Sequence, residues 1–186
     1  MWTKIRSTIW EIVKFVAITL VIVLPIRTFV AQPFIVSGSS MHPTFESNQY
    51  LVIDELSYYF REPIRGEVIV FKYPKDPAKH FIKRIIGLPG ETVKITNGEV
   101  LITTVGNKPE QIKLAEPYVQ ENLAVANLEV KLLNNEYFVL GDNRPVSLDS
   151  RIWGPLPRNL ITGRVFLRLL PPSTLAYLPG QPAQAK

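Results

Sequence analysis

The longest apolar run of the chain lies near its N-terminus, at residues 15–26, and follows basic residues at positions 4, 6 and 14. As a helix this run rises about 18 Å, less than the roughly 30 Å hydrocarbon core of a bilayer. A helix over 8–26 reaches about 28 Å, provided that Glu11 and Lys14 pair or snorkel toward the headgroups. Residues 1–31 are therefore predicted to hold a cytoplasmic stub and one transmembrane signal-anchor.

A cleaved signal peptide is the alternative interpretation of this N-terminus. Such a peptide ends in a small-x-small tripeptide, whereas Phe29, two residues before Ala31, is bulky. Three basic residues precede the apolar run, and one, Arg27, directly follows it. The bulky Phe29 favours a retained anchor, and the charge bias favours a cytoplasmic N-terminus and residues from 32 onward on the extracytoplasmic side of a plasma or thylakoid membrane.

After the apolar run the pattern changes to period two, in short segments rich in Val, Ile, Phe and Tyr. These segments predict strands at 51–53, 68–73, 81–86, 92–96, 99–102, 137–140 and 165–169. Asn97-Gly98 is typical of a two-residue hairpin turn, which would pair Ile95 with Val100. The predicted fold class is therefore mainly β, an antiparallel body with one N-terminal transmembrane helix.

Length and composition set the domain organisation. A chain of 186 residues fits one catalytic body better than two full domains. We predict an extracytoplasmic β-rich domain over 32–170, with a small excursion or subdomain at 103–136 where the periodicity is weak. Residues 171–186, rich in Pro, Gln, Ala and Gly, are predicted to form a flexible tail.

Charge and cysteine content exclude several classes of function. The net charge is +5, but the basic residues are scattered and form no stripe. This distribution favours an anionic lipid bilayer as partner and no nucleic acid. The chain has no Cys, which excludes disulfides, a thiolate nucleophile and Cys-ligated metal sites.

Ser40 is the candidate nucleophile, because it opens the segment Ser-Met-His-Pro-Thr (40–44) just beyond the apolar run. A serine hydroxyl needs a base within hydrogen-bonding reach and donors for an oxyanion. In an extended segment His42 would point to the opposite face from Ser40, and His80 follows a loop-like stretch with two prolines. A turn serine is the alternative for Ser40, and a Ser-His-Asp triad would depend on His80.

Lys83 is the third candidate base, since it lies in the strand-like run 81–86 with Arg84 beside it. Alternation puts the two side chains on opposite faces, so at least one cation meets apolar surroundings. Burial can lower a lysine pKa from about 10.4 into the neutral range, which would make Lys83 a general base. The alternative is an edge strand whose Lys83 and Arg84 both snorkel to solvent.

A polar block from Gly141 to Arg151 follows the predicted strand 137–140. A solvated turn is the ordinary interpretation of such a block. Ser147, Asp149 and Arg151 alternate, however, so one face could present a hydroxyl, a carboxylate and a guanidinium. Together with Asp142, these groups and neighbouring arginines could build a buried ion-pair frame.

These three blocks, in this order, resemble the type I signal peptidases, membrane-anchored Ser-Lys endopeptidases that remove signal peptides from exported preproteins. Segment 40–44 matches the family's nucleophile box, 83–90 its lysine box and 141–151 its last box, while 65–71 is similar to the strand before the lysine box. The similarity covers most of 29–163. Segment 27–31 is similar to cyanobacterial and chloroplast members.

The resemblance implies that Ser40 is the nucleophile and that Lys83 is the general base for both acylation and deacylation. The supporting residues that it implies are Ser147, which would hydrogen-bond the Lys83 amine, and two ion pairs, Asp142 with Arg84 and Asp149 with Arg151. It also implies an all-β body with an apolar surface near the lipid bilayer, a reduced second β subdomain, and no metal or cofactor.

The resemblance further implies that signal peptides are the partners and that shallow pockets hold small residues at the first and third positions before the cut. The lining residues implied for these pockets are Phe34, Val36, Met41 and Ile82. An Ala-x-Ala preference would follow from such pockets.

Some members have a serine two residues before the nucleophile that helps to form the oxyanion hole, and here that position is Gly38. Other members also have glycine there. The Ser40 backbone N–H would then act with a further donor, for which Ser37 and Ser39 are candidates.

Two other functions stay open at the level of sequence. One is a Ser-Lys maturation peptidase dedicated to a single secretion system. The other is a catalytically silent, membrane-tethered β module that binds exported chains or lipid.

Overall fold

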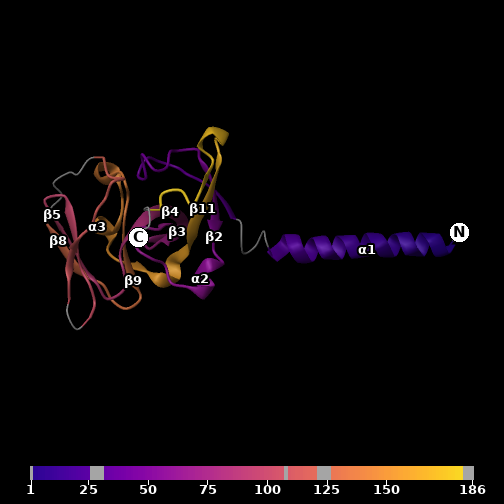
Figure 1. Ribbon diagram of the computed structural model, residues 1–186, viewed down its shortest axis with the longest axis horizontal. Helices are drawn as coiled ribbons and strands as arrows, with labels where there is room; N and C mark the ends of the chain where they lie inside the picture. The colour runs from indigo at the N-terminus through magenta and orange to yellow at the C-terminus, as the bar shows by residue number, and fades with distance from the viewer. Residues whose placement is uncertain (1, 26–31, 107–108, 121–126, 182–186) are drawn as a thin grey trace.

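The computed structural model describes residues 2–25, 32–106, 109–120 and 127–181, and within the first helix it describes the side chains of residues 9–21. That helix, α1 (Trp2–Pro25), extends away from a β-rich body (Figure 1). The predicted mainly antiparallel β class is confirmed. Over the part of the chain that the structure describes, none of the helices has the length and apolar character needed to cross a bilayer. The last residue of the predicted span and the rest of the predicted anchor segment, 26–31, lie outside the described residues.

The main sheet has eight strands with the order β1-β2-β11-β3-β4-β9-β10, and β12 pairs with β11. Its strands are β1 (Gln32–Ile35), β2 (Tyr50–Asp54), β3 (Val68–Tyr73), β4 (Asp76–Gly87), β9 (Glu136–Leu140), β10 (Leu156–Pro157), β11 (Ile161–Leu170) and β12 (Ala176–Tyr177). Short helical turns connect them: α2 (Ser57–Phe60), η2 (Arg144–Val146), α3 (Ser150–Trp153), η3 (Arg158–Leu160) and η4 (Pro172–Thr174). All paired strands are antiparallel.

Both faces of the central strands are buried. On β3, Val68 and Val70 enter one hydrophobic cluster while Ile69 and Phe71 enter another, as the period of two requires. β4 lies between β3 and β9, so it is not an edge strand. The alternative in which Lys83 and Arg84 snorkel to solvent is therefore wrong, and the two side chains are buried on opposite faces of a central strand.

A second sheet of four strands has the order β7-β6-β5-β8 and forms the far end of the body from α1 (Figure 1). Its strands are β5 (Thr92–Thr96), β6 (Glu99–Thr103), β7 (Gln111–Lys113) and β8 (Leu128–Lys131). The hairpin register is confirmed, since Ile95 pairs with Val100. The subdomain begins at Thr92, earlier than the predicted 103, because the apolar face of this hairpin packs with Leu132 and Phe138 in a separate cluster. Residues 107–108 and 121–126 of the predicted excursion lie outside the described residues.

The C-terminal segment is not the free tail that its composition predicted, at least as far as Gln181. β12 pairs with β11, and the ring of Tyr177 packs edge-on against Phe166 at 5.2 Å between centroids. The Leu178 N–H donates to the Phe166 carbonyl at 2.8 Å. Strand pairing and one aromatic contact thus hold a segment whose overall composition is poor in apolar residues. Residues 182–186 lie outside the described residues.

Candidate active site

Ser40 and Lys83 meet in the folded body although 43 residues separate them. Lys83 Nζ donates to Ser40 Oγ at 2.6 Å and to the Ile82 carbonyl at 2.9 Å. Lys83 comes from the centre of β4, and Ser40 from the turn that follows β1. A rigid central strand therefore presents the amine to a hydroxyl held on a loop.

Burial changes the acid-base chemistry of Lys83, whose side chain is 4% exposed. The loss of solvation lowers the pKa of Lys83 from 10.5 to about 8, while the charges of Asp149 and Asp142 act in the opposite direction. At pH 7 about a tenth of the Lys83 side chains are then neutral, far more than for an exposed lysine. A neutral amine in contact with a hydroxyl is suited to act as a general base.

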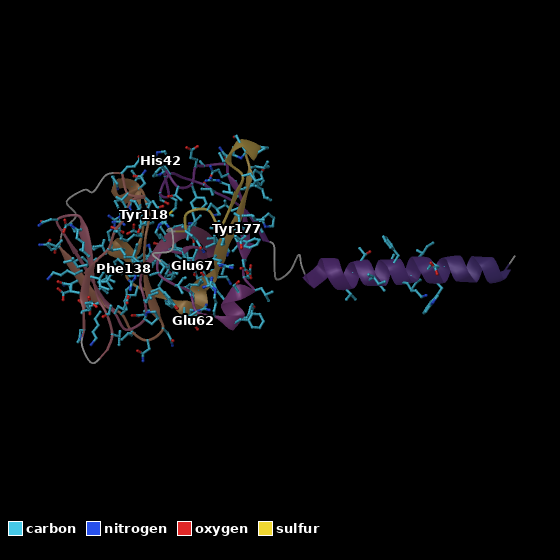
Figure 2. All side chains as sticks on the ribbon, in the orientation of Figure 1. His42, Glu62, Glu67, Tyr118, Phe138 and Tyr177 are labelled. Carbon is cyan, nitrogen blue, oxygen red and sulfur yellow. The ribbon has the colours of Figure 1, made fainter. Side chains whose placement is uncertain are left out.

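Neither histidine takes this position beside Ser40. His42 is exposed at the surface of the body (Figure 2). His80 lies within β4, because the turn after β3 comprises only residues 74–75 and the strand already begins at Asp76. Its ring packs on Phe34 with 5.5 Å between centroids. Among the described residues the structure thus assembles a Ser-Lys pair and no Ser-His pair.

The loop after β9 holds the Ser40 turn from one side. Asn143 N–H donates to the Ser40 carbonyl at 3.0 Å, and Asn143 Nδ2 donates to the Ser39 carbonyl at 3.1 Å. Gly141 allows this close approach, since a Cβ there would lie 2.5 Å from the Ser40 carbonyl oxygen and would collide with Ser147 Oγ. Only glycine leaves room for this contact, and hydrogen bonds from Asn143 fix the Ser40 turn.

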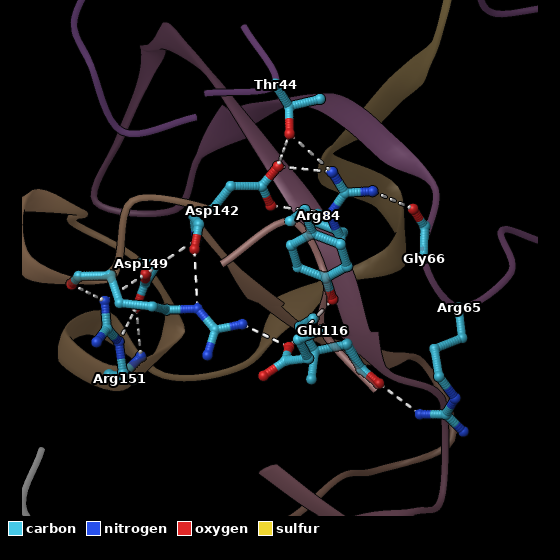
Figure 3. Close-up of polar contacts among 12 residues, drawn as sticks. Thr44, Arg65, Gly66, Arg84, Glu116, Asp142, Asp149 and Arg151 are labelled. Carbon is cyan, nitrogen blue, oxygen red and sulfur yellow. Dashed lines mark hydrogen bonds and ion pairs between the residues drawn. The ribbon is translucent and has the colours of Figure 1, made fainter. Parts of the chain in front are cut away.

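An ion pair between Arg84 and Asp142 stands behind this turn. The Arg84 guanidinium donates from Nε at 2.8 Å and from Nη2 at 2.6 Å to the two oxygens of Asp142, and each side chain is 1% exposed or less (Figure 3). Thr44 Oγ1 donates to the same carboxylate at 2.5 Å. Because Thr44 is four residues after Ser40, the pair links the Ser40 segment to β4, the strand that carries Lys83.

A second pair orders the polar loop itself. Arg151 donates from Nε and Nη2 to Asp149 at 2.8 Å each, and Asp149 has no exposed surface. The Asp149 carboxylate also accepts the Gly141 N–H at 3.1 Å, and Arg151 Nη2 donates to the Arg144 carbonyl at 2.8 Å. The loop that carries Gly141 and Asn143 is thereby pre-organised.

Several residues of this frame were not predicted from the sequence. Glu116 pairs with Arg144 at 2.5 Å, and the Tyr118 ring lies under the Arg84 guanidinium at 3.9 Å from its centroid. Both come from the weakly periodic segment between β7 and β8. The carbonyl of Gly66 accepts from Arg84 Nη1 at 2.9 Å. A buried guanidinium requires hydrogen-bond acceptors. The expected burial of an arginine was therefore the only feature of the sequence that could have indicated these partners.

Ser147 differs from its expected role. Its Oγ is buried and, within the described part of the chain, has no hydrogen-bond partner. The expected hydrogen bond from Ser147 to the Lys83 amine is therefore wrong for this structure. The reason is local, because the hydroxyl packs against Gly141 while the Lys83 amine is occupied by Ser40 and the Ile82 carbonyl.

A cavity of about 380 Å³ opens beside the Ser-Lys pair. Phe34, Val36 and Ile82 line it together with Ser40 and Lys83, and so do residues 37–39. Met41 does not line it, because this side chain is 1% exposed and belongs to the hydrophobic core behind the turn. The cavity therefore combines an apolar wall with the hydroxyl of Ser40.

The sequence profile of signal peptidase, peptidase S26, matches residues 9–170. The chain belongs to the signal peptidase family. A signal peptidase I from Leptolyngbya laminosa is 39% identical over 97% of this chain and 89% of that protein. A probable signal peptidase I-2 from Synechocystis is 39% identical over 89% of this chain and 75% of that protein.

Similarity also extends to a solved structure. The crystal structure of a signal peptidase I from Enterococcus faecalis V583 is 30% identical, covers 56% of this chain and 97% of its own, and gives a TM-score of 0.47.

The family is one of serine endopeptidases, so this signal peptidase is a hydrolase of peptide bonds. Among the described residues no three His, Asp or Glu side chains gather as metal ligands. The side chains that surround the cavity can supply a nucleophile, a base and apolar contacts.

Proposed function

We propose that this signal peptidase I cuts preproteins through the hydroxyl of Ser40, with Lys83 as the general base. The 2.6 Å contact between Lys83 Nζ and Ser40 Oγ carries this proposal. When Lys83 is neutral, the same contact lets the hydroxyl donate its proton to the amine. Burial of Lys83 supports the assignment, because the neutral form is then populated at lower pH than in an exposed lysine.

The reaction follows in two half-reactions. Lys83 takes the Ser40 proton while Oγ attacks the scissile carbonyl carbon. The tetrahedral intermediate expels the amine of the mature protein, which receives the proton from Lys83, and leaves the signal peptide esterified to Ser40. Lys83 then takes a proton from water while the resulting hydroxide attacks the ester carbon. The bond to Ser40 Oγ breaks, Lys83 returns the proton to that oxygen, and the signal peptide leaves as a carboxylic acid that ionises in water.

The oxyanion would be stabilised by backbone and hydroxyl donors of the turn. The Ser40 N–H is the first donor, and Ser37 and Ser39 are the candidates for a second, since both line the cavity. Gly38 has a φ of +93°, a conformation that favours glycine, and its N–H donates to Ser47 Oγ at 3.3 Å. Loss of one oxyanion donor typically lowers turnover by about 100- to 1000-fold.

Selectivity for small residues before the cut would come from the apolar wall of the cavity. Phe34, Val36 and Ile82 narrow it beside the nucleophile, while Met41 supports the turn from the core. β1 is the last strand of its sheet, and an extended peptide can add to such an edge. An Ala-x-Ala segment bound along β1 would place two small side chains against the wall.

The N-terminal segment would act as a membrane anchor. The apolar run 15–26, its preceding basic residues and the single Arg27 after it support a cytoplasmic N-terminus and an extracytoplasmic catalytic body. The proposed partners are therefore the signal peptides of exported preproteins and the lipid bilayer in which they are embedded.

Cleavage of a preprotein in lipid vesicles by the full chain tests this function. The wild type is expected to give one cut after a small residue, identified by product mass, while Ser40→Ala and Lys83→Ala give none. Activity retained in either purified and folded variant would refute the Ser-Lys assignment. Processing of several unrelated preproteins separates a general peptidase from one dedicated to a single substrate, and binding without cleavage by the wild type would indicate a silent module.

A further inference from the structure

The C-terminal strap, defined here as residues 176–181, lies against the ion pair behind the active site. The Gly180 carbonyl accepts a hydrogen bond from Arg84 Nη1, and the preceding Pro179 is buried. A Cβ at Gly180 would lie 2.7 Å from Thr44 Cγ2 and 3.2 Å from the Phe45 ring. The strap thus contacts both β4, which carries Lys83, and the segment that follows Ser40.

The strap is attached to the body at its other end. Tyr177 and Ala176 pair with Leu167 and Arg168 of β11. The Arg168 guanidinium continues toward the site, since its Nη1 donates to the Thr44 carbonyl at 2.9 Å. Thr44 is therefore connected to β11 in two ways, by its contact with the strap and by its hydrogen bond with Arg168.

Arg84 is the residue on which the strap acts most directly. Its guanidinium is 1% exposed and is surrounded by Asp142, the Gly66 carbonyl, the Gly180 carbonyl and the face of Tyr118. A buried guanidinium needs an acceptor for each donor, so removal of one acceptor is costly. The Gly180 carbonyl thus helps to keep Arg84 in place on Asp142.

The state of this ion pair matters for the base next to it. The charged or titratable groups around Lys83 are Asp142, Asp149 and Arg84, together with His80 across the cavity. The negative charge of Asp142 raises the pKa of Lys83, and Arg84 holds that charge in a bidentate pair. If Arg84 moved away from Asp142, the unpaired carboxylate would favour the protonated and catalytically inactive form of Lys83.

We propose that the C-terminal strap is a positioning element of the active site, which acts through Arg84 and Thr44 to keep Ser40 and Lys83 in register. This inference rests on the proposed Ser-Lys function. It assigns a role to a part of the chain that lies beyond residue 170, where the match to the signal peptidase profile ends.

Gly180→Ala is the most direct perturbation, because it places a methyl group against Thr44 at a residue whose φ is +79°. The matched control is Gly106→Ala, which also has a positive φ but has no heavy atom within 4 Å of the added methyl. The readout is the pH profile of kcat and kcat/KM for preprotein cleavage in vesicles. We expect the acidic limb of Gly180→Ala to move upward by about one pH unit, which lowers kcat at pH 7 by about 10-fold and leaves KM unchanged.

Tyr177→Ala provides a milder second variant if Gly180→Ala folds poorly, since it removes the ring contact with Phe166 and introduces no clash. It should shift the limb in the same direction by a smaller amount. Reduced thermal stability with an unmoved pH profile in both variants would overturn the proposal, because a merely structural strap would behave so. Failure of the Ser-Lys function itself is distinguishable, since the wild type would then show no acidic limb that depends on Lys83.

Discussion

Lys83→Met should make the folded protein more stable at neutral pH although it destroys activity. Lys83 is buried and its pKa is lowered from 10.5 to about 8 by the loss of solvation. That difference corresponds to about 3 kcal/mol of free energy by which the protonated lysine destabilises the folded state. Methionine fills a similar volume without a charge, so it removes this cost.

The pH dependence of the effect distinguishes it from ordinary repacking. Below about pH 8 Lys83 is protonated in both the folded and the unfolded chain, and the full cost of about 3 kcal/mol is present. Between about pH 8 and 10.5 the unfolded chain binds the proton and the folded chain does not, so wild-type stability rises with pH. The advantage of the variant should therefore fade across this range.

Urea unfolding of the full chain in detergent, for wild type and Lys83→Met at matched pH values from 7 to 10.5, measures this difference. Other groups titrate equally in both proteins and cancel. The expected difference declines by about 3 kcal/mol from the lowest to the highest pH. A difference that is constant with pH, or a wild type that is the more stable protein at pH 7, would refute the depressed pKa of Lys83.

Three further substitutions test the frame and the cavity. Gly141→Ala puts a Cβ 2.5 Å from the Ser40 carbonyl oxygen, and the displaced turn should lower kcat by about 100-fold in steady-state assays. Asp142→Asn leaves the buried charge of Arg84 without its partner and should cost about 3 to 5 kcal/mol in urea unfolding. Val36→Phe should narrow the cavity and raise KM for an Ala-x-Ala preprotein by about 10-fold or more, and because Val36 also belongs to the core cluster it should lower the thermal midpoint as well.

The strands were the most predictable part of the fold, because each has an apolar face that repeats with period two. β3 and β5 have the bounds that the pattern predicted, and the Asn97-Gly98 turn set the hairpin register. β1, β7 and β8 are three or four residues long, so period two had too few positions to be visible. The ordered strap was missed because composition averages over its few anchoring contacts, such as the Tyr177 ring on Phe166.

The candidate site was predictable where one short segment carries a whole chemical group, as for Ser40, Lys83 and the 141–151 block. Their meeting in space could not be derived from alternation, which gives only the face of a strand. The partners of Arg84 illustrate the limit, since Tyr118 and the Gly180 carbonyl come from segments without periodicity. Ser147 shows the converse, since a hydrogen bond to the Lys83 amine was expected and the structure does not form it. Its hydroxyl lies beside Gly141 without a hydrogen-bond partner among the described residues.

The pH profile of single-turnover cleavage tests the central claim that Lys83 activates Ser40. With a vesicle-embedded preprotein and wild-type enzyme, the rate should rise about tenfold per pH unit and level off near pH 8, where the folded lysine loses its proton. Ser40→Ala should give no product at any pH. A rate that is flat below pH 8, or an acidic limb that persists in Lys83→Ala, would contradict the account.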